Sequence, residues 1–521
     1  MDPVFGIDFG TTNTRVAFFD GERVRMVPFR SAEQGTTYQC PTRVAYQNGQ
    51  PVAFGRAAQL RPPEKVLTDP GLKWLLDSAE PVEVSGGERD RVDVVADFLK
   101  FVRDSVGQSI KSALLSAAAV TIPVHYPPAA RERLRDAFKR AGITVTHFFY
   151  EPIAAIYTGL LGNPAAGVAA VFDWGGGSLD IATVRVRDGV ALSVRTDGWH
   201  RGGSHFDRDI AELAVSDFLA RYPQPAQVTA ERLLRDTEKG RELFWQAEGV
   251  KIELSRATVA SVAFPNFLPG RSLDVRFTRD EFEQIIAPDL TGAAARLDAA
   301  LRDSGVTPKT LARLFLSGGT CNIPAVRDKL RAEVAGHRIV DRLVLPKELV
   351  DPHQAKGLDD IGNATAIGAA LLAVHGAKPV FASTVGVRLA ENGGTGFLPV
   401  FAANDEVKFG PNTLRFAVSD ASSVARLMVC ERTDAATEPG GRLLRLVTVP
   451  VQPDEKWLDV KFTVDRQLAL RVDAAGHADM PKVNGRVDHA NFPHPPEWVQ
   501  GLNLGFRLPE FAPDPAPARL F

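Results

Sequence analysis

The most informative stretch of this sequence reads GVAAVFDWGGGSLDIATV, in which an apolar run ends at Asp173 and a glycine triplet follows. Ser178 and Asp180 come directly after the triplet, which consists of Gly175, Gly176 and Gly177. Glycine has no Cβ and tolerates positive φ, so successive N–H groups of such a turn can converge on phosphate oxygens. Carboxylates beside the turn suit Mg2+, which prefers oxygen ligands and retains water. The pattern indicates a phosphate and magnesium site, with an ordinary glycine-rich hairpin as the alternative.

A similar arrangement occurs near the N-terminus, where VFGIDFGTTNT places Asp8 and Gly10 ahead of the hydroxyls of Thr11 and Thr12. Both copies continue as apolar runs that turn at an Asp-Gly pair, at 20–21 and at 188–189. Asp-Gly between alternating apolar runs is a strong hairpin signal. The sequence therefore predicts two β-hairpin phosphate loops, in two similar lobes that hold one polyphosphate between them.

Two further glycine pairs add to the candidate site. TLARLFLSGGTCNIPAV reads as a strand, Gly318 and Gly319, and a helix, and ligand sites of α/β proteins gather at such strand ends. In HRGGSHFD, the pair at 202–203 precedes an expected helix and predicts free N–H groups for an anion. His200 and His205 flank this pair, but no third residue at a recognisable spacing completes a metal site.

Helices and strands must hold these loops in place, and the first 374 residues alternate between the two. A buried strand is expected at 117–123, and a helical pair or one long helix at 92–115. Further helices are expected from 127 to 142, from Glu151 onward, and at 231–255, 277–301 and 363–374. Glu248, Lys251 and Ser255 lie at i, i+3 and i+7 of the expected 231–255 helix and so share one face. On spacing alone, this polar helix face is predicted to be exposed to solvent. Lys73, which stands beside Trp74, is likewise predicted from its local sequence to be a surface residue.

The pattern changes after residue 374. A linker is expected at 375–383, and short strands at 424–431, 443–451, 458–464 and 468–472 predict an antiparallel sandwich. Loops are expected at 405–407 and 434–441. The Pro-rich tail at 491–521 shows no helical period and is expected to be irregular.

Composition limits the classes of partner and compartment. The net charge of -2 gives no support for a nucleic-acid or anionic-membrane partner. Three widely spaced cysteines fit a reducing cytoplasm better than a disulfide framework. No apolar run is long enough to cross a bilayer, and Met1 leads almost directly into a strand, so neither a membrane span nor a signal peptide is expected.

Together these segments resemble the nucleotide-binding domain of the heat shock protein 70 family of chaperones. GIDFGTTNTRVA resembles its first phosphate loop, VFDWGGGSLDIATV its second and FLSGGTCNIPAV its adenosine loop, while CPTRVAY, LKWLL, VTIPVHY, FYEPIAAIY, GGSHFD, EGVKIELS and NATAIGAA match intervening segments in order. The resemblance covers about residues 4–375 and continues more weakly to about residue 490. It implies an α/β two-lobed actin-like ATPase domain with ribonuclease-H-like lobes at 1–374. A linker at 375–383, a small all-β sandwich domain for client peptides at 384–490 and a Pro-rich tail at 491–521 would follow.

The resemblance also implies roles for individual residues. Lys73 falls on the lysine that positions the attacking water and the γ-phosphate, and Thr11, Asp173 and Asp180 complete the catalytic set with Glu151. Asp8, Glu151 and Asp173 fall on the carboxylates that hold Mg2+, largely through water. The residues expected to bind ATP or ADP are Asp8, Gly10, Thr11, Thr12, Asn13, Lys73, Gly175, Gly176, Gly177, Ser178, Gly202, Gly203, Glu248, Lys251, Ser255, Gly318, Gly319, Thr320 and Asn322.

By this resemblance the chain is a slow ATPase of the chaperone class, whose nucleotide state controls how the β domain binds a protein or peptide segment. Pro123 and Arg131 fall on the relay between the two domains. The expected partner is a protein or peptide client, either a range of clients or a single dedicated one. A J-domain protein or a nucleotide-exchange factor would act with it. The alternatives are a nucleotide-gated adaptor or scaffold with negligible turnover, and a small-molecule kinase of the same superfamily.

Three departures from the family pattern bear on these expectations. Asn322 stands where the family usually has an arginine stacked on adenine, which predicts weaker nucleotide binding. The segment HGAKPVF lacks the leucines and the aspartate of the family linker, which questions the docking of the β domain. No helical lid is expected after the sandwich, which argues against slow trapping of peptides.

Overall fold

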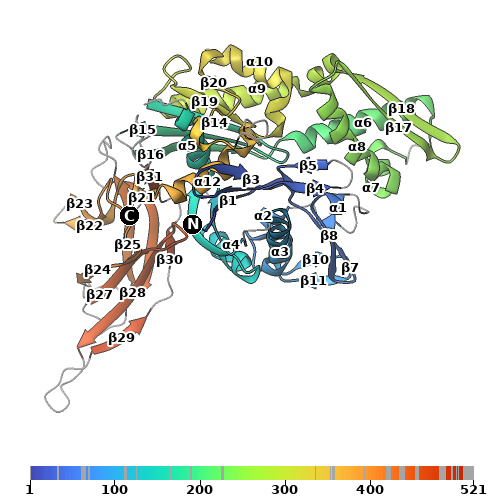
Figure 1. Ribbon diagram of the computed structural model, residues 1–521. Coiled ribbons are helices and arrows are strands. Elements are labelled where there is room, and N and C mark those ends of the chain that lie inside the picture. The colour runs from blue at the N-terminus through green and yellow to red at the C-terminus, as the bar shows by residue number, and fades with distance from the viewer. Residues whose placement is uncertain are drawn as a thin grey trace. The chain divides into compact units, whose positions relative to one another are not determined.

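The chain divides into two units (Figure 1). The first unit comprises residues 1–124, 133–187 and 194–374, and the second comprises 125–132, 188–193 and 375–521. The structure is a computed structural model that describes residues 2–31, 35–59, 61, 66–67, 71–110, 114–124, 126–162, 167–187, 190–224, 228–334, 336–351, 354, 358, 360–391, 394–417, 424–432, 441–451, 457–479, 489–493, 497–499, 502 and 504–508.

Two mixed sheets of the first unit share one plan. The first has the order β13-β12-β1-β2-β3, with β6 beside β2, and the second contains β20-β19-β14-β15-β16. Each sheet contains a hairpin, β1-β2 or β14-β15. The first strand of each hairpin also pairs with a parallel strand, β1 with β12 and β14 with β19. These strands are β1 (Val4–Phe9), β2 (Asn13–Phe19), β3 (Val24–Met26), β6 (Cys40–Pro41), β12 (Ala117–Ile122), β13 (Thr144–Tyr150), β14 (Gly167–Trp174), β15 (Leu179–Arg187), β16 (Val190–Trp199), β19 (Arg313–Ser317) and β20 (Ile339–Val340).

Smaller sheets and helices complete this part of the chain. The short strands are β4 (Phe29–Ser31), β5 (Gly35–Thr37), β7 (Val44–Gln47), β8 (Gln50–Phe54), β9 (Val66–Leu67), β10 (Val82–Val84), β11 (Gly87–Arg89), β17 (Val259–Leu268) and β18 (Arg271–Thr278). The α-helices are α1 (Gly55–Gln59), α2 (Leu72–Leu75), α3 (Arg91–Ser109), α4 (Pro128–Arg140), α5 (Glu151–Gly162), α6 (Gly203–Arg221), α7 (Ala230–Asp236), α8 (Glu238–Leu254), α9 (Arg279–Asp303), α10 (Pro324–Glu333) and α12 (Ala364–Val374). Short 3-10 turns include η2 (Gly319–Asn322) and η5 (Ile361–Asn363).

Helices α5 and α12 pack against each other, α12 against the first sheet and α5 against strands of both sheets. A Cβ on Gly6 of β1 would lie 2.3 Å from the Ala366 carbonyl oxygen of α12, and a Cβ on Gly368 would lie 2.0 Å from that of Ala154 in α5. Glycine at these two positions therefore allows backbone-to-backbone packing that no other residue permits. Since this packing joins β1 and β14 through two rigid helices, it fixes the bases of both phosphate loops.

The prediction of one helix over 231–255 is wrong, because α7 and α8 are separate. The Thr237 hydroxyl accepts the Gly240 N–H at 2.9 Å and so caps the start of α8. A Cβ on Gly240 would lie 1.8 Å from the Leu233 carbonyl oxygen of α7, so the two helices meet closely. The helical region expected at 92–115 is also too long, since α3 ends at Ser109.

The second unit contains antiparallel sheets of the orders β23-β22-β25-β26 and β24-β27-β28-β29, with β30 also beside β28. The strands are β21 (Lys378–Phe381), β22 (Thr384–Glu391), β23 (Gly394–Phe401), β24 (Gly410–Ala417), β25 (Val424–Arg432), β26 (Arg442–Pro450), β27 (Trp457–Val464), β28 (Leu470–Asp479), β29 (His489–Pro493), β30 (Glu497–Val499) and β31 (Leu504–Arg507). The four predicted strands correspond to β25, β26, β27 and β28. Most of the expected loop at 434–441 lies outside the described residues, as does the tail after residue 508.

The prediction of an irregular tail is wrong, because the tail contains the end of β29 and all of β30 and β31. The expected linker at 375–383 contains β21. β31 pairs with β21 on one side and with residues 190–192 of β16 on the other. Leu504, Phe506 and Leu508 alternate and are buried, a strand period that the Pro-rich composition around it concealed.

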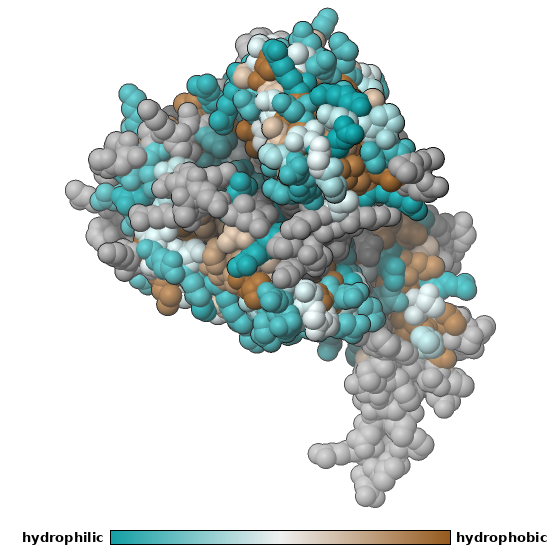
Figure 2. Space-filling view, turned by 90° about the vertical axis from the view of Figure 1, so that its right-hand side faces the viewer, coloured by the Kyte–Doolittle hydropathy of each residue, from teal (hydrophilic) through white to brown (hydrophobic). Residues whose placement is uncertain are grey.

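On the face shown in Figure 2, hydrophilic residues are interspersed with hydrophobic ones. Among the described residues, no helix combines the length and the apolar character needed to span a bilayer.

Candidate functional site

The second glycine loop connects β14 and β15 and is closed by its own backbone. Asp173 pairs with Asp180 across the hairpin, so the two carboxylates lie opposite each other at the strand ends. The Gly175 N–H donates to the Ser178 carbonyl at 2.9 Å, and the Ser178 hydroxyl donates to Asp180 Oδ2 at 2.8 Å. The loop is therefore a tight turn with a carboxylate at each foot.

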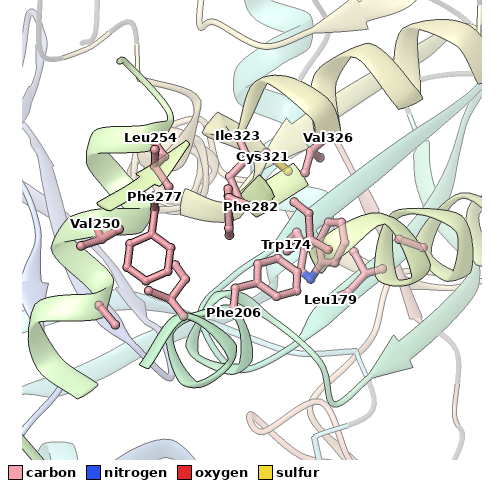
Figure 3. Packing of buried hydrophobic residues seen from close by; sticks show 14 of the residues in the cluster. Trp174, Leu179, Phe206, Val250, Leu254, Phe277, Phe282, Cys321, Ile323 and Val326 are labelled. Carbon is pink, nitrogen blue, oxygen red and sulfur yellow. The ribbon is translucent and has the colours of Figure 1, made fainter. Parts of the chain in front are cut away.

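Buried side chains on either side of the glycines anchor this loop (Figure 3). Trp174 and Leu179, which bracket the turn, are fully buried, and the Trp174 ring meets Phe206 of α6 edge-on at 5.7 Å. The Trp174 indole N–H donates to the Arg201 carbonyl at 2.9 Å. Cys321 of η2 belongs to the same cluster. One hydrophobic core thus fixes three loops that the sequence analysis singled out separately.

The first glycine loop, between β1 and β2, faces the second. A Cβ on Gly176 would lie 2.7 Å from Thr12 Oγ1, and one on Gly177 would lie 3.8 Å from Thr11 Cγ2. The buried Thr14 hydroxyl bonds to that of Thr42 at 2.9 Å and holds the base of the first loop. In the described part of the chain, no group accepts a hydrogen bond from the backbone N–H of the four loop residues Thr11, Thr12, Gly176 and Gly177. These donors lie together and are available to an anion.

Lys73 and Glu151 form a buried ion pair beside the loops. Lys73 lies on α2 with only 4% of its surface exposed, and its ammonium donates to the carboxylate of Glu151 at the start of α5. Burial opposes the charge, but Glu151 and Asp8 together raise the pKa of Lys73 above its usual value. Lys73 is therefore a protonated cation inside the site, not the exposed lysine that its local sequence suggests.

Carboxylates are crowded around this pair. Burial, with a further contribution from Glu151, raises the pKa of Asp8 to about 6. Burial, followed by the charges of Asp180, Asp8 and Glu151, raises the pKa of Asp173 to about 7. The site therefore contains more negative charge than its lysine offsets, and this oxygen-rich set fits a hard cation such as Mg2+.

Direct ligation of a metal by several side chains has no support in the described residues, where no group of three His, Cys, Asp or Glu side chains could hold an ion. The set therefore fits a hydrated ion. The imidazole of His205, one half of the possible histidine site, has another role, because its Nδ1 accepts the Gly202 N–H at 3.1 Å. Burial and then the charge of Arg201 lower the pKa of His205, which suits this acceptor role.

The expectation that the 202–203 pair offers free N–H groups is wrong. Besides the Gly202 bond to His205, the Gly203 N–H donates to the Gly175 carbonyl at 3.0 Å. A Cβ on Gly202 would lie 2.7 Å from the carbonyl oxygens of both Gly175 and Gly176. The pair thus serves to bring the start of α6 against the second glycine loop.

The adenosine-side residues divide into two groups. Lys251 of α8 pairs with Asp207 at 2.7 Å and donates to the Gly203 carbonyl at 3.0 Å, and the Thr320 hydroxyl donates to the Gly175 carbonyl at 2.8 Å. Thr320 therefore contacts the second loop, and Lys251 contacts α6. Asn322 is exposed and accepts from Arg327 at 2.8 Å, and the Ser255 hydroxyl donates back to the Lys251 carbonyl at 3.1 Å.

The remaining predicted residues lie on the same elements. Gly318 has φ 82, and a Cβ there would lie 2.3 Å from the Trp174 carbonyl oxygen, so only glycine fits. Gly10 is similar, since its Cβ would lie 2.4 Å from the Asn13 carbonyl oxygen. Gly319 opens η2, and Glu248 is half-buried on α8.

Sequence reasoning missed Arg15. The β1-β2 register places Arg15 directly opposite Asp8, and the Arg15 Nη1 lies 4.0 Å from Asp8 Oδ2. Counting back across the expected hairpin from its turn would have found this pair. Arg15 brings a second cation to the carboxylates.

A comparison with protein-family models matches residues 77–351 to the model described as Hsp70 protein. The match covers more than half of the 521 residues. The chain belongs to the Hsp70 family. Hsp70 family members are in general ATP-dependent chaperones that bind ATP or ADP with Mg2+ and act on client peptides with co-chaperones. The matched span contains Glu151, the second glycine loop and the turn at Gly318 and Gly319, whereas the first glycine loop and Lys73 precede it.

Proposed function

We propose that this Hsp70 family member is a slow ATPase with a two-lobed actin-like domain, which binds Mg·ATP between its two glycine loops. The observation that carries the proposal is the facing arrangement of Thr11 and Thr12 with Gly176 and Gly177, whose N–H groups have no acceptor in the described part of the chain. Paired nests of backbone donors suit the two ends of a polyphosphate.

Phosphoryl transfer to water requires positioning and charge neutralisation rather than covalent chemistry. Lys73, held by Glu151, would orient the attacking water and the γ-phosphate, and Thr11 and Asp180 would complete the catalytic set. Asp8, Glu151 and Asp173 would hold Mg2+ through its waters, and the bound ion would neutralise phosphate charge. Hydroxyls of Thr12 and Ser178 would contact phosphate, and α8 and η2 would flank the nucleoside.

The second unit supports a role in binding a protein or peptide segment, with β22–β29 as a sandwich domain. Arg131, in the first turns of α4, is buried and donates to the carbonyl oxygens of Gln467 and Leu468, at 3.1 and 3.0 Å, within this unit. A relay through Pro123 and Arg131 would therefore act on the loop before β28. The three cysteines are free and buried, which supports a reducing compartment such as the cytoplasm.

The proposal is tested by measuring Mg·ATP binding and steady-state phosphate release by the full chain, with and without a permanently unfolded protein. Slow release whose rate changes with the unfolded protein is the expected result. Tight binding without release would favour the adaptor or scaffold. Phosphate transfer to a panel of sugars and polyols would favour the small-molecule kinase. Failure to bind nucleotide would overturn the proposal.

Asn322→Arg is expected to tighten nucleotide binding by about two- to thirtyfold, since an arginine stacked on a purine contributes about 0.5–2 kcal/mol. Asn322 is exposed, so the longer side chain has room. Its amide oxygen bonds to Arg327, so Asn322→Gln is the matched control for loss of that geometry. Fluorescent ADP titration measures the effect, and unchanged or weaker affinity would contradict the stacking interpretation.

A further inference from the structure

Arg15 is fixed in place by its neighbours in the first unit. Its side chain is only 14% exposed, although it begins on a short hairpin strand. Its Nη2 donates to Gln39 Oε1 at 2.8 Å, and its Nη1 lies 4.0 Å from Asp8 Oδ2. The guanidinium is therefore held between an amide and a carboxylate of the first glycine loop.

The backbone of η5 supports the same guanidinium. A Cβ on Gly362 would lie 2.9 Å from Arg15 Nη2, so this glycine leaves the space that the side chain occupies. The Gly362 N–H donates to Asp360 Oδ1 at 2.9 Å, which fixes the turn. Contacts from β1, the 37–39 segment and η5 thus determine where the positive charge lies.

The position of this charge matters because the other cation at the site is already paired. Lys73 donates to Glu151 and also interacts with Asp8, whereas Arg15 lies directly opposite Asp8 in the strand register. A positive charge beside a carboxylate disfavours binding of a second cation there, whereas the phosphates of a nucleotide add negative charge and restore it.

We propose that Arg15 is a positioning residue that makes Mg2+ binding conditional on nucleotide: it keeps free Mg2+ out of the carboxylate cluster, and the ion enters with the phosphates. The inference rests on the proposed ATP site. Without Arg15, the cluster would take the ion before the nucleotide arrives. With Arg15, the protein distinguishes Mg·ATP from its separate components.

The test compares wild-type protein with Arg15→Gln and Arg15→Lys, using calorimetric titration of Mg2+ into the full chain without nucleotide. Removing a unit charge about 4 Å from a carboxylate is expected to tighten binding of free Mg2+ by about tenfold or more. Arg15→Lys keeps the charge and is expected to remain close to wild type. Arg185→Gln on β15 is the matched control, an exposed arginine at the corresponding hairpin strand, and is expected to change nothing.

Gly362→Ala provides a second variant that keeps Arg15 but must shift its guanidinium, because the new Cβ would lie 2.9 Å from Nη2, and it is expected to change the affinity for free Mg2+. Unchanged or weaker binding of free Mg2+ in Arg15→Gln, with a normal unfolding transition, would overturn the inference. Titration of ADP with and without Mg2+ separates this outcome from failure of the proposed function. If wild-type protein binds Mg·ADP and Arg15→Gln shows no gain for free Mg2+, only the inference fails; if no nucleotide binds, the ATP site itself is wrong.

Discussion

Replacing Lys73 with alanine is expected to abolish ATP hydrolysis while largely sparing ATP binding. The ammonium is buried and held by Glu151, where in the proposed mechanism it would orient water and the γ-phosphate, whereas the loop N–H groups that would bind the other phosphates remain. Loss of a preorganised charge at a developing transition state costs roughly 10²–10³-fold in rate. Single-turnover phosphate release and equilibrium ATP binding, measured on the same preparation, distinguish the two effects.

Two controls make this result specific. Lys100→Ala removes a half-exposed lysine of α3 that pairs with Asp97 at 3.9 Å, and its turnover is expected to match wild type. Lys73→Met keeps much of the buried volume, so a loss shared with the alanine variant reports the charge rather than a cavity. Equal loss of binding and turnover in Lys73→Ala would sink the role assigned to this residue.

Gly202→Ala is expected to weaken nucleotide binding at least about tenfold and to lower turnover further. Its backbone is extended, a conformation that alanine adopts freely, so the effect does not come from backbone strain. The new Cβ would instead lie 2.7 Å from the carbonyl oxygens of Gly175 and Gly176, and must displace the second loop. Misplacing reacting groups by 1 Å can cost roughly 100-fold in rate.

Gly249→Ala is the matched control, because a Cβ on this α8 residue meets nothing within 4 Å. In a helix interior, replacing glycine with alanine stabilises the folded protein by about 0.5–1 kcal/mol. The unfolding temperature of Gly249→Ala should therefore rise slightly, while its nucleotide affinity stays unchanged. Fluorescent ADP titration and thermal unfolding measure both variants. Wild-type affinity in Gly202→Ala would mean that the second loop does not contact the nucleotide.

The sequence alone determined much about the hairpins. Short strands that end in an aspartate, glycines and hydroxyls have few local solutions, so the loops at Asp8 and Asp173 and the alternating α/β order could be predicted. The family resemblance added Lys73 and Glu151, whose local sequence indicates only a surface lysine and a helix-terminal carboxylate. Packing reverses that local interpretation, since Lys73 is buried against Glu151.

Only the tertiary structure shows which groups that are far apart in the sequence come into contact. The N–H groups of Gly202 and Gly203 are bonded within the protein because α6 starts against the second loop, and no local pattern reveals that. β31 forms because its alternating apolar side chains find β16 and β21, which lie about 300 and 120 residues earlier in the chain. Arg15 gains its role from the strand register and from Gly362, a contact across more than 300 residues. Local patterns predict most of the elements, but long-range packing adds strands such as β31 and decides which polar groups remain available for chemistry.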